Sequence, residues 1–175
     1  MKIAGIIAEY NPFHNGHAWH IRRTREATGC DYMKKAGIPP HVTVCALVSD
    51  REEALLAETA RLAEDLRKGP VFFADIGVFN PLVIYLGPVM NEFLLNACKT
   101  VNERLLRYAE VGNLGRYLPY QWVPHAAIAV KLTPEALKKA FEIVQENFTA
   151  FPATAERLVL ARAEPYEPLR VRTLK

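Results

Sequence analysis

The feature that most constrains this chain is a short pattern that occurs twice. In each copy a proline and a histidine begin an alternating apolar run, which is then followed by a helical pattern. The first copy is Pro40-His41-Val42-Thr43-Val44 and the second is Pro124-His125-Ala126-Ala127-Ile128. The two histidines are 84 positions apart. A duplicated strand-helix unit indicates two similar lobes that face each other.

Each copy predicts a strand followed by a capped helix. Residues 41–48 alternate, which places His41, Thr43, Cys45 and Leu47 on one strand face. In the second copy the shared face holds His125, Ala127, Ala129 and Lys131. We expect Ser49 or Asp50 to cap a helix over residues 51–68 that Gly69 ends. Thr133 is the expected cap of a helix to about residue 147, with Pro134 at its first position.

The rest of the chain adds strands and helices around these two units. We expect a buried strand over residues 2–8, then a helix over about 16–28 that ends at Gly29. Two further strands are expected near 156–163 and 169–174. A hairpin is predicted from 71–79 and 82–89 with its turn at Asn80-Pro81, and a helix from 91–110 ends at Gly112. The prediction is one bilobal α+β domain over residues 1–175, with antiparallel sheets.

Composition narrows the classes of protein. The chain has 175 residues, half of them hydrophobic, which is enough for one sizeable domain or two small lobes without disulfides or metal. A net charge of +3 suits a ligand with phosphate but is too small for a nucleic-acid-binding tail.

Cellular location is inferred from the cysteines and the N-terminus. Cys30, Cys45 and Cys98 are too far apart for a disulfide framework or a Cys-x-x-Cys metal site, which favours a reducing cytoplasm. The apolar run over residues 3–8 meets Glu9 too early for a signal peptide or a membrane span. We therefore expect a soluble cytoplasmic protein that does not bind membranes, and no obligate protein partner is evident.

Two histidines that face one cleft can cleave a phosphodiester without a metal or another cofactor. A neutral imidazole takes a proton from water or a hydroxyl, and a protonated one gives a proton to the leaving oxygen. Thr43 would donate a hydrogen bond to a non-bridging phosphate oxygen, where charge builds up in the transition state. The alternative is structural, with each histidine only beginning a strand and bonded to a loop carbonyl.

Residues 33–175 resemble the two-histidine phosphoesterases, also called the 2′-5′ RNA ligase family. The resemblance rests on Ile38-Pro39-Pro40-His41-Val42-Thr43 and Trp122-Val123-Pro124-His125. It implies a two-lobed α+β fold and action on 2′,3′-cyclic phosphate ends of RNA or related nucleotides. It also implies that His41, Thr43 and His125 are site residues. Which of the two histidines acts as the acid and which as the base stays open. Ala127 departs from the family pattern, which has a hydroxyl at that position, so one of two phosphate donors is missing.

Three other residues are candidates for substrate binding. Tyr120 and Trp122 precede the second histidine and are able to stack on a base beside the site, although core packing explains them equally well. Lys131 shares the predicted face of His125 and is placed to meet a phosphate, although an exposed lysine at a strand end is the common case. These roles stay open at the level of sequence.

A second, independent signal lies near the N-terminus. His14, Gly16 and His17 form a His-x-Gly-His motif that follows a strand and opens a helix, where backbone amides and imidazoles can hold nucleotide phosphates. Residues 1–32 resemble the start of the tRNA cytidine acetate ligase family through the run Gly5-Ile6-Ile7-Ala8-Glu9-Tyr10-Asn11-Pro12-Phe13-His14-Asn15-Gly16-His17. That resemblance implies activation of acetate with ATP.

We expect the ligase resemblance to end near residue 32, because no further alternation of parallel strands and helices follows. We interpret residues 1–32 as a replacement for the first strand and helix of the two-histidine fold. The main hypothesis is therefore a metal-free cyclic phosphodiesterase, weakened by Ala127. The alternatives are an ATP-dependent nucleotidyltransferase that uses His14 and His17, and a nucleotide-binding module without turnover.

Overall fold

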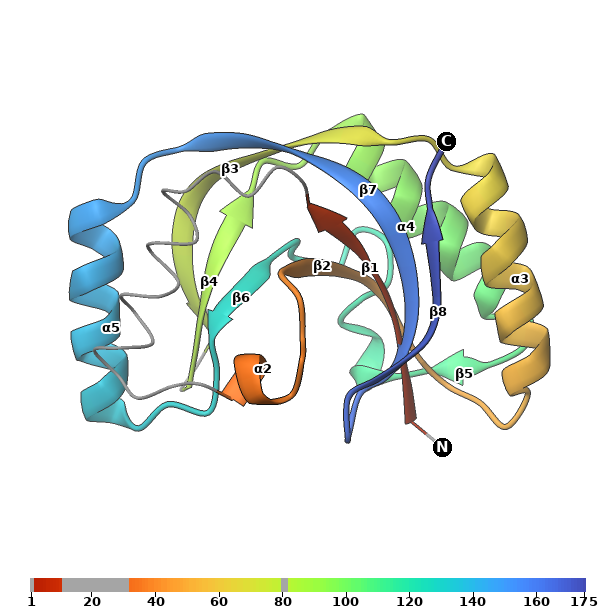
Figure 1. The fold of residues 1–175 in the computed structure, drawn as a ribbon, viewed down its shortest axis with the longest axis horizontal. Helices are drawn as coiled ribbons and strands as arrows, with labels where there is room; N and C mark the ends of the chain where they lie inside the picture. The colour runs from red at the N-terminus through yellow and green to blue at the C-terminus, as the bar shows by residue number, and fades with distance from the viewer. Residues whose placement is uncertain (1, 11–31, 80–81) are drawn as a thin grey trace.

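In the computed structural model, helices and antiparallel strands combine into an α+β fold (Figure 1). The structure describes residues 2–10, 32–79 and 82–175. Its strands form one antiparallel sheet with the order β5-β2-β1-β7-β3-β4-β6, and β8 pairs with β7. The elements are β1 Lys2–Tyr10, α2 Tyr32–Lys35, β2 His41–Val48, α3 Glu52–Asp65, β3 Gly69–Phe79, β4 Val83–Pro88, α4 Glu92–Leu105, β5 Glu110–Val111, a short 3₁₀ turn at Asn113–Gly115, β6 Ala126–Ala129, α5 Pro134–Asn147, β7 Phe151–Arg162 and β8 Glu167–Thr173.

Most of the predicted elements are present. The strand at 41–48 has the expected bounds, and the hairpin forms from β3 and β4. Thr133 caps α5 by accepting a hydrogen bond from the amide of Ala136 at 3.2 Å, with Pro134 in the first turn. The first strand and the two late strands are also observed, and the late strands pair with each other as β7 and β8. The helix expected over 16–28 and the turn at Asn80-Pro81 lie outside the described residues.

The predicted cap and end of α3 were wrong. Arg51 is at the cap position and makes no capping bond through its side chain. The hydroxyl of Ser49 instead accepts from the amide of Arg51 at 2.9 Å and donates to the carbonyl of Tyr108 at 2.7 Å, which ties the start of the helix to a distant loop. The helix ends at Asp65, and Gly69 is the first residue of β3 rather than a helix stop.

The predicted end of α4 was also wrong. The helix stops at Leu105, and residues 110–111 form the short strand β5 against β2. Gly112 then donates its amide hydrogen to the carbonyl of Ala46 at 2.9 Å. A Cβ at this glycine would lie 2.8 Å from the backbone nitrogen of Leu47, so the close approach to β2 explains the glycine.

The face predicted for the second histidine strand holds only in its first half. The pairing between β4 and β6 shifts register between the pairs Ile84–Ala129 and Tyr85–Ala127. This irregularity turns Ala129 into the same buried cluster as Ile128, although strict alternation would place the two on opposite faces. Lys131 lies beyond β6 with a φ of 56° and is exposed.

Among the residues whose side chains the structure describes, two hydrophobic clusters form the core. The larger one joins β2, β7, α3 and α4 around residues such as Val42, Leu62 and Leu160. The smaller one joins β4, β6 and α5 around Ile84, Ile128 and Val144. The long strand β7 arches from the side of α5 to the side of α3 (Figure 1), and it pairs with β3, β1 and β8.

Two expectations from composition concern the cysteines and the membrane. Cys45 and Cys98 are both buried and both free thiols, while Cys30 lies outside the described residues. Among the residues that the structure describes, no helix combines the length and the apolar character needed to cross a membrane.

Candidate functional site

His41 and His125 line the same cavity, although one belongs to β2 and the other immediately precedes β6. The cavity has a volume of about 310 Å³. Thr43, two residues after His41, and Ala127, two residues after His125, line it as well. The structure therefore brings together the two histidines, the predicted hydroxyl donor and the alanine that replaces the second donor. The other lining residues are Tyr32, Met33, Ile38, Phe79, Val83, Tyr117 and Val130.

Both imidazoles are held in the same way by the backbone. His41 Nδ1 lies 2.8 Å from the carbonyl oxygen of Pro39, and His125 Nδ1 lies 2.7 Å from the carbonyl oxygen of Val123. A carbonyl oxygen can only accept, so Nδ1 carries the hydrogen in each ring. In the neutral form of each histidine the Nε2 atom is then the unprotonated one, able to accept a proton. In both copies of the Pro-His pattern the backbone thus fixes the same tautomer, with the hydrogen on Nδ1.

The surroundings of the histidines favour their neutral forms. Desolvation lowers the pKa of His41, its hydrogen bond to Pro39 opposes this effect, and the nearby charge of His125 lowers the pKa further. Desolvation also lowers the pKa of His125, with partial opposition from the bond to Val123. The charge of His125 thus contributes to the lowered pKa of His41, as expected for two rings that line one cavity.

Aromatic side chains surround His125, and the sequence interpretation did not single them out. The ring of Phe79 lies 4.6 Å from the imidazole, edge-on at 82°, and Tyr117 lies 6.0 Å away. Phe79 also stacks on Tyr85 with 4.3 Å between ring centroids. Phe79 ends β3, whereas Tyr117 belongs to the loop before β6. No local sequence pattern marks these two rings. The pairing of the hairpin with β6 brings Phe79 to the histidine, and the path of the loop brings Tyr117 there.

The segment of α2 covers another side of the cavity through Tyr32, Met33 and Ile38. Lys131 places its ammonium group 3.9 Å from the centroid of the Tyr32 ring. This cation–π contact joins the residue after β6 to the segment before β2. Lys131 does not itself line the cavity, so its position supports the shape of the site through Tyr32.

The two aromatic residues predicted to stack beside the histidines are elsewhere. Trp122 is only 6% exposed and belongs to the larger hydrophobic cluster, so it is a core residue. Tyr120 is 79% exposed, and it lines a separate groove on α4 rather than the histidine cavity. Trp122 thus has the core position that the sequence left open, and neither ring lines the histidine cavity. A loop without regular periodicity gives no indication of which side chain turns inward.

A larger cavity of about 600 Å³ adjoins the histidine cavity. The two cavities share four lining residues, which are Phe79, Val83, Tyr117 and His125. The larger cavity adds polar side chains from the loop before β6, namely Asn113, Arg116 and Gln121. There is thus space for a group larger than a phosphate next to His125.

A buried amide positions the loop relative to β2. The Nδ2 atom of Asn102, which is 3% exposed on α4, lies 2.9 Å from the carbonyl of Val44 and 3.1 Å from that of Tyr117. It also lies 2.8 Å from the carbonyl of Cys98. One side chain therefore links the strand that carries His41 and Thr43 to the loop that contacts His125.

Comparisons with known proteins give two different similarities. Residues 1–34 match the family described as HIGH nucleotidyl transferase. The tRNA(Met) cytidine acetate ligase of Caldicellulosiruptor saccharolyticus is 68% identical over 33 residues, which cover 19% of this chain and 8% of that protein. That of Clostridium kluyveri is 68% identical over 31 residues, which cover 18% and 8%. The motif that contains His14, Gly16 and His17 falls in this matched segment, but those residues lie outside the described residues.

The similarity to the ligases extends further in one relative. The tRNA(Met) cytidine acetate ligase of Acetivibrio thermocellus is 26% identical over 161 residues, which cover 89% of this chain and 35% of that protein. The expectation that the resemblance ends near residue 32 is therefore wrong for this relative. The chain covers only 8% to 35% of the length of these three ligases.

The fold is that of a phosphoesterase. A crystal structure described as a phosphoesterase matches with a TM-score of 0.55 and 16% sequence identity, over 98% of this chain and 97% of that one. The match covers almost the whole of both chains. At this level of identity the similarity concerns the fold alone.

Proposed function

We propose that this protein is a metal-independent phosphodiesterase that acts on 2′,3′-cyclic phosphate ends of RNA or on related nucleotides. The observation that carries the proposal is the matched pair of imidazoles. His41 and His125 line one cavity, and each has its Nδ1 hydrogen engaged by the carbonyl two residues earlier. A phosphoesterase fold and a cavity that also contains Thr43 support the same function.

The reaction needs one histidine in each protonation state. The neutral imidazole takes a proton from water through Nε2 as the water oxygen bonds to phosphorus. The protonated imidazole gives its Nε2 hydrogen to the ribose oxygen as the phosphorus–oxygen bond of the ring breaks. The product is a ribose monophosphate, and the two rings have exchanged protonation states. Because both rings are held alike, either of them can be the acid.

Thr43 has the role of a phosphate donor, and Ala127 has no group that can play this role. A hydroxyl at 43 donates to a non-bridging oxygen that gains charge in the transition state. The loss of one such donor typically lowers the rate by roughly 10²-fold or more. We therefore propose a slow enzyme, in which Ala127→Thr raises turnover by up to about this factor.

The proposal includes a two-lobed arrangement with a pseudo-twofold axis between β3 and β7. The sheet order β2-β1-β7-β3-β4-β6 supports it, because the two histidine strands occupy equivalent places from the centre. The helices α3 and α5 start 82 positions apart, at Glu52 and Pro134. Val71 and Ala153 pair across the centre and are also 82 positions apart. The same offset thus relates the helices and the central strands.

Hydrolysis of a 2′,3′-cyclic nucleotide by purified variants tests the proposal. We expect His41→Ala and His125→Ala each to lower kcat by about 10²-fold or more, since each removes a proton-transfer group. The Ala127→Thr variant tests the missing donor. Ser49→Ala, which removes a buried hydroxyl outside the cavity, is the control for a change of hydroxyl content away from the two histidines. Activity that survives the loss of both histidines would refute the proposal. Nucleotide binding without turnover in any variant would favour a binding module.

The match of residues 1–34 to the HIGH nucleotidyl transferases favours a second candidate function. This alternative is an ATP-dependent nucleotidyltransferase or ligase that works through His14 and His17. Exchange of labelled pyrophosphate into ATP measures it directly, with acetate present as the acid to be activated. Exchange that is lost in His14→Ala/His17→Ala but kept in His41→Ala/His125→Ala would establish the alternative, and the absence of exchange would reject it.

A further inference from the structure

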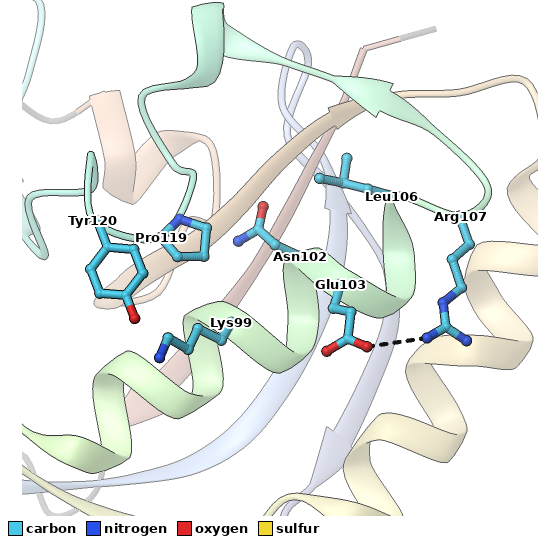
Figure 2. Close-up of a pocket in the computed structure, with 7 residues that line it drawn as sticks. All are labelled: Lys99, Asn102, Glu103, Leu106, Arg107, Pro119 and Tyr120. Carbon is cyan, nitrogen blue, oxygen red and sulfur yellow. Dashed lines mark hydrogen bonds and ion pairs between the residues drawn. The ribbon is translucent and has the colours of Figure 1, made fainter.

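We propose that a groove on the outer side of α4 binds the single-stranded RNA that leads to the phosphodiester in the histidine cavity. This inference rests on the proposed function and narrows it, since it makes an oligonucleotide end the preferred substrate over a free nucleotide. The groove has a volume of about 510 Å³. Figure 2 shows Lys99 and Glu103 on α4 and Arg107 just beyond its end, with Pro119 and Tyr120 of the following loop at the other end of the groove.

Tyr120 provides an aromatic surface in this groove. The residue is 79% exposed, so burial does not account for its position. Its φ of 67° lies in the left-handed region, which a residue with a bulky side chain adopts at a cost that the surrounding structure must support. A strained backbone that presents an aromatic ring to solvent is typical of a binding surface. Such a ring stacks on unpaired bases of any sequence.

Basic side chains flank the ring. The ammonium of Lys99 lies 4.9 Å from the centroid of Tyr120. Arg107 lies eight positions after Lys99, just beyond the end of α4 at Leu105. Its guanidinium pairs with Glu103 at 3.3 Å, but both side chains are well exposed, at 63% and 72%. Exposed pairs of this kind are weak, so a phosphate can replace the carboxylate of Glu103.

The groove and the histidine cavity lie on either side of one short loop. Tyr117 lines the histidine cavity, Gln121 lines the larger cavity beside it, and Tyr120 lines the groove. Tyr120 is three positions after Tyr117, so their Cα atoms are at most about 11 Å apart. A strand with its last phosphate at the histidines would cross this loop and reach the ring of Tyr120. A groove of this kind, with a stacking surface and cations, suits unpaired rather than double-stranded RNA.

The test compares two substrates that differ only in length. These are a ribonucleoside 2′,3′-cyclic phosphate and a pentaribonucleotide with the same cyclic phosphate at its 3′ end. We expect Tyr120→Ala to lower kcat/KM for the pentanucleotide by about tenfold, because a stacked base is lost, and to leave the mononucleotide unchanged. Tyr120→Phe keeps the ring and should keep the wild-type values. The variant Lys99→Gln tests the cation beside the ring. Its matched control is Lys139→Gln, which removes an exposed lysine from α5.

Binding separates this inference from the proposed function. Fluorescence anisotropy of a labelled pentanucleotide with a 3′-phosphate is measured on the variant His41→Ala/His125→Ala, with and without Tyr120→Ala. We expect Tyr120→Ala to weaken binding about tenfold and Glu103→Gln to strengthen it. If neither substrate is hydrolysed but these affinities change as expected, the groove stands and the phosphodiesterase proposal fails. Equal effects of Tyr120→Ala on both substrates, no effect on either, or preferential binding of an acidic peptide would overturn the inference.

Discussion

Replacement of Asn102 is expected to destabilise the protein far more than the loss of one hydrogen bond on the surface. The side chain is 3% exposed, and its two amide hydrogens serve the carbonyl groups of Val44, Cys98 and Tyr117. A buried acceptor left without its donor costs about 1–3 kcal/mol. With about 1.5 kcal/mol for each of the two N–H groups, Asn102→Ala should lower the free energy of unfolding by about 3 kcal/mol. For a domain of this size the melting temperature falls by roughly 6–12 °C.

Urea unfolding followed by circular dichroism measures this loss, and Asn147→Ala is the matched control. Asn147 donates one hydrogen bond, to the carbonyl of Ile143 at 2.7 Å, and it lies at the end of α5. Its replacement should cost about 1 kcal/mol or less. If the two variants differ in stability by less than about 1 kcal/mol, the three hydrogen bonds of the Asn102 side chain do not have the role assigned to them.

A second variant at the same position gives a pH-dependent result. In Asn102→Asp a carboxylate would face carbonyl oxygens in a buried place, so the folded state raises the pKa of the new group above its unfolded value of about 3.9. Stability is then retained below pH 3.9 and is lost as the pH rises through the folded value. The destabilisation relative to wild type should increase between pH 4 and pH 7. A constant difference over this range would show that the site is open to water.

Three further predictions concern titratable groups. Because the pKa values of both cavity histidines are lowered, kcat/KM should reach its maximum below pH 6.5. At higher pH it should fall about tenfold per pH unit, as the histidine that acts as the acid loses its proton. A maximum above pH 7 in a pH–rate profile would contradict this. Burial raises the pKa of Cys45 to about 12 and that of Cys98 to about 11, so iodoacetamide at pH 8 should modify neither thiol before urea is added, as peptide mass spectrometry would show. Desolvation raises the pKa of Glu58, but Arg104 and Arg61 together lower it below its usual value. The loss of stability in Arg104→Leu should therefore be greater at pH 7, where Glu58 is charged, than at pH 3. An equal loss at the two pH values in thermal unfolding would be inconsistent with this pairing.

The fold was predictable where local signals and tertiary contacts agree. Thr133 and Pro134 form a complete helix start, and the structure uses it. The expected cap at Ser49 or Asp50 failed because a tertiary contact with Tyr108 engages the serine hydroxyl. The predicted face of the second histidine strand failed at the irregular pairing of Ala127 and Ala129 with β4. Which residue is displaced there depends on the partner strand, and no periodicity in the sequence of β6 records it.

The candidate site was predictable only in the parts that repeat. Two Pro-His units in register point to a shared cavity that contains His41, Thr43 and His125. The role of each preceding carbonyl in fixing the tautomer follows from the same repeat, once the geometry is known. The aromatic rings of Phe79 and Tyr117 belong to elements distant in sequence and meet His125 only through folding. Tyr120 and Trp122 are also aromatic and lie in the same loop as Tyr117, but Tyr120 faces the groove on α4 and Trp122 faces the core.

The segment that resembles the ligases contributes a strand to the interior of the sheet. Its strand β1 pairs with β2 on one side and with β7 on the other, so it lies inside the sheet. Glu9 pairs with His41, and Tyr32, near the other end of the matched residues 1–34, lines the histidine cavity. Described residues on both sides of the His-x-Gly-His motif therefore lie close to the two-histidine site. Reduced hydrolysis in a variant at His14 or His17 would not by itself support the ligase hypothesis, because the matched residues 1–34 also include β1, which pairs with the strand of His41. ATP–pyrophosphate exchange separates the two functions, because hydrolysis of a cyclic phosphate by the proposed mechanism involves no ATP.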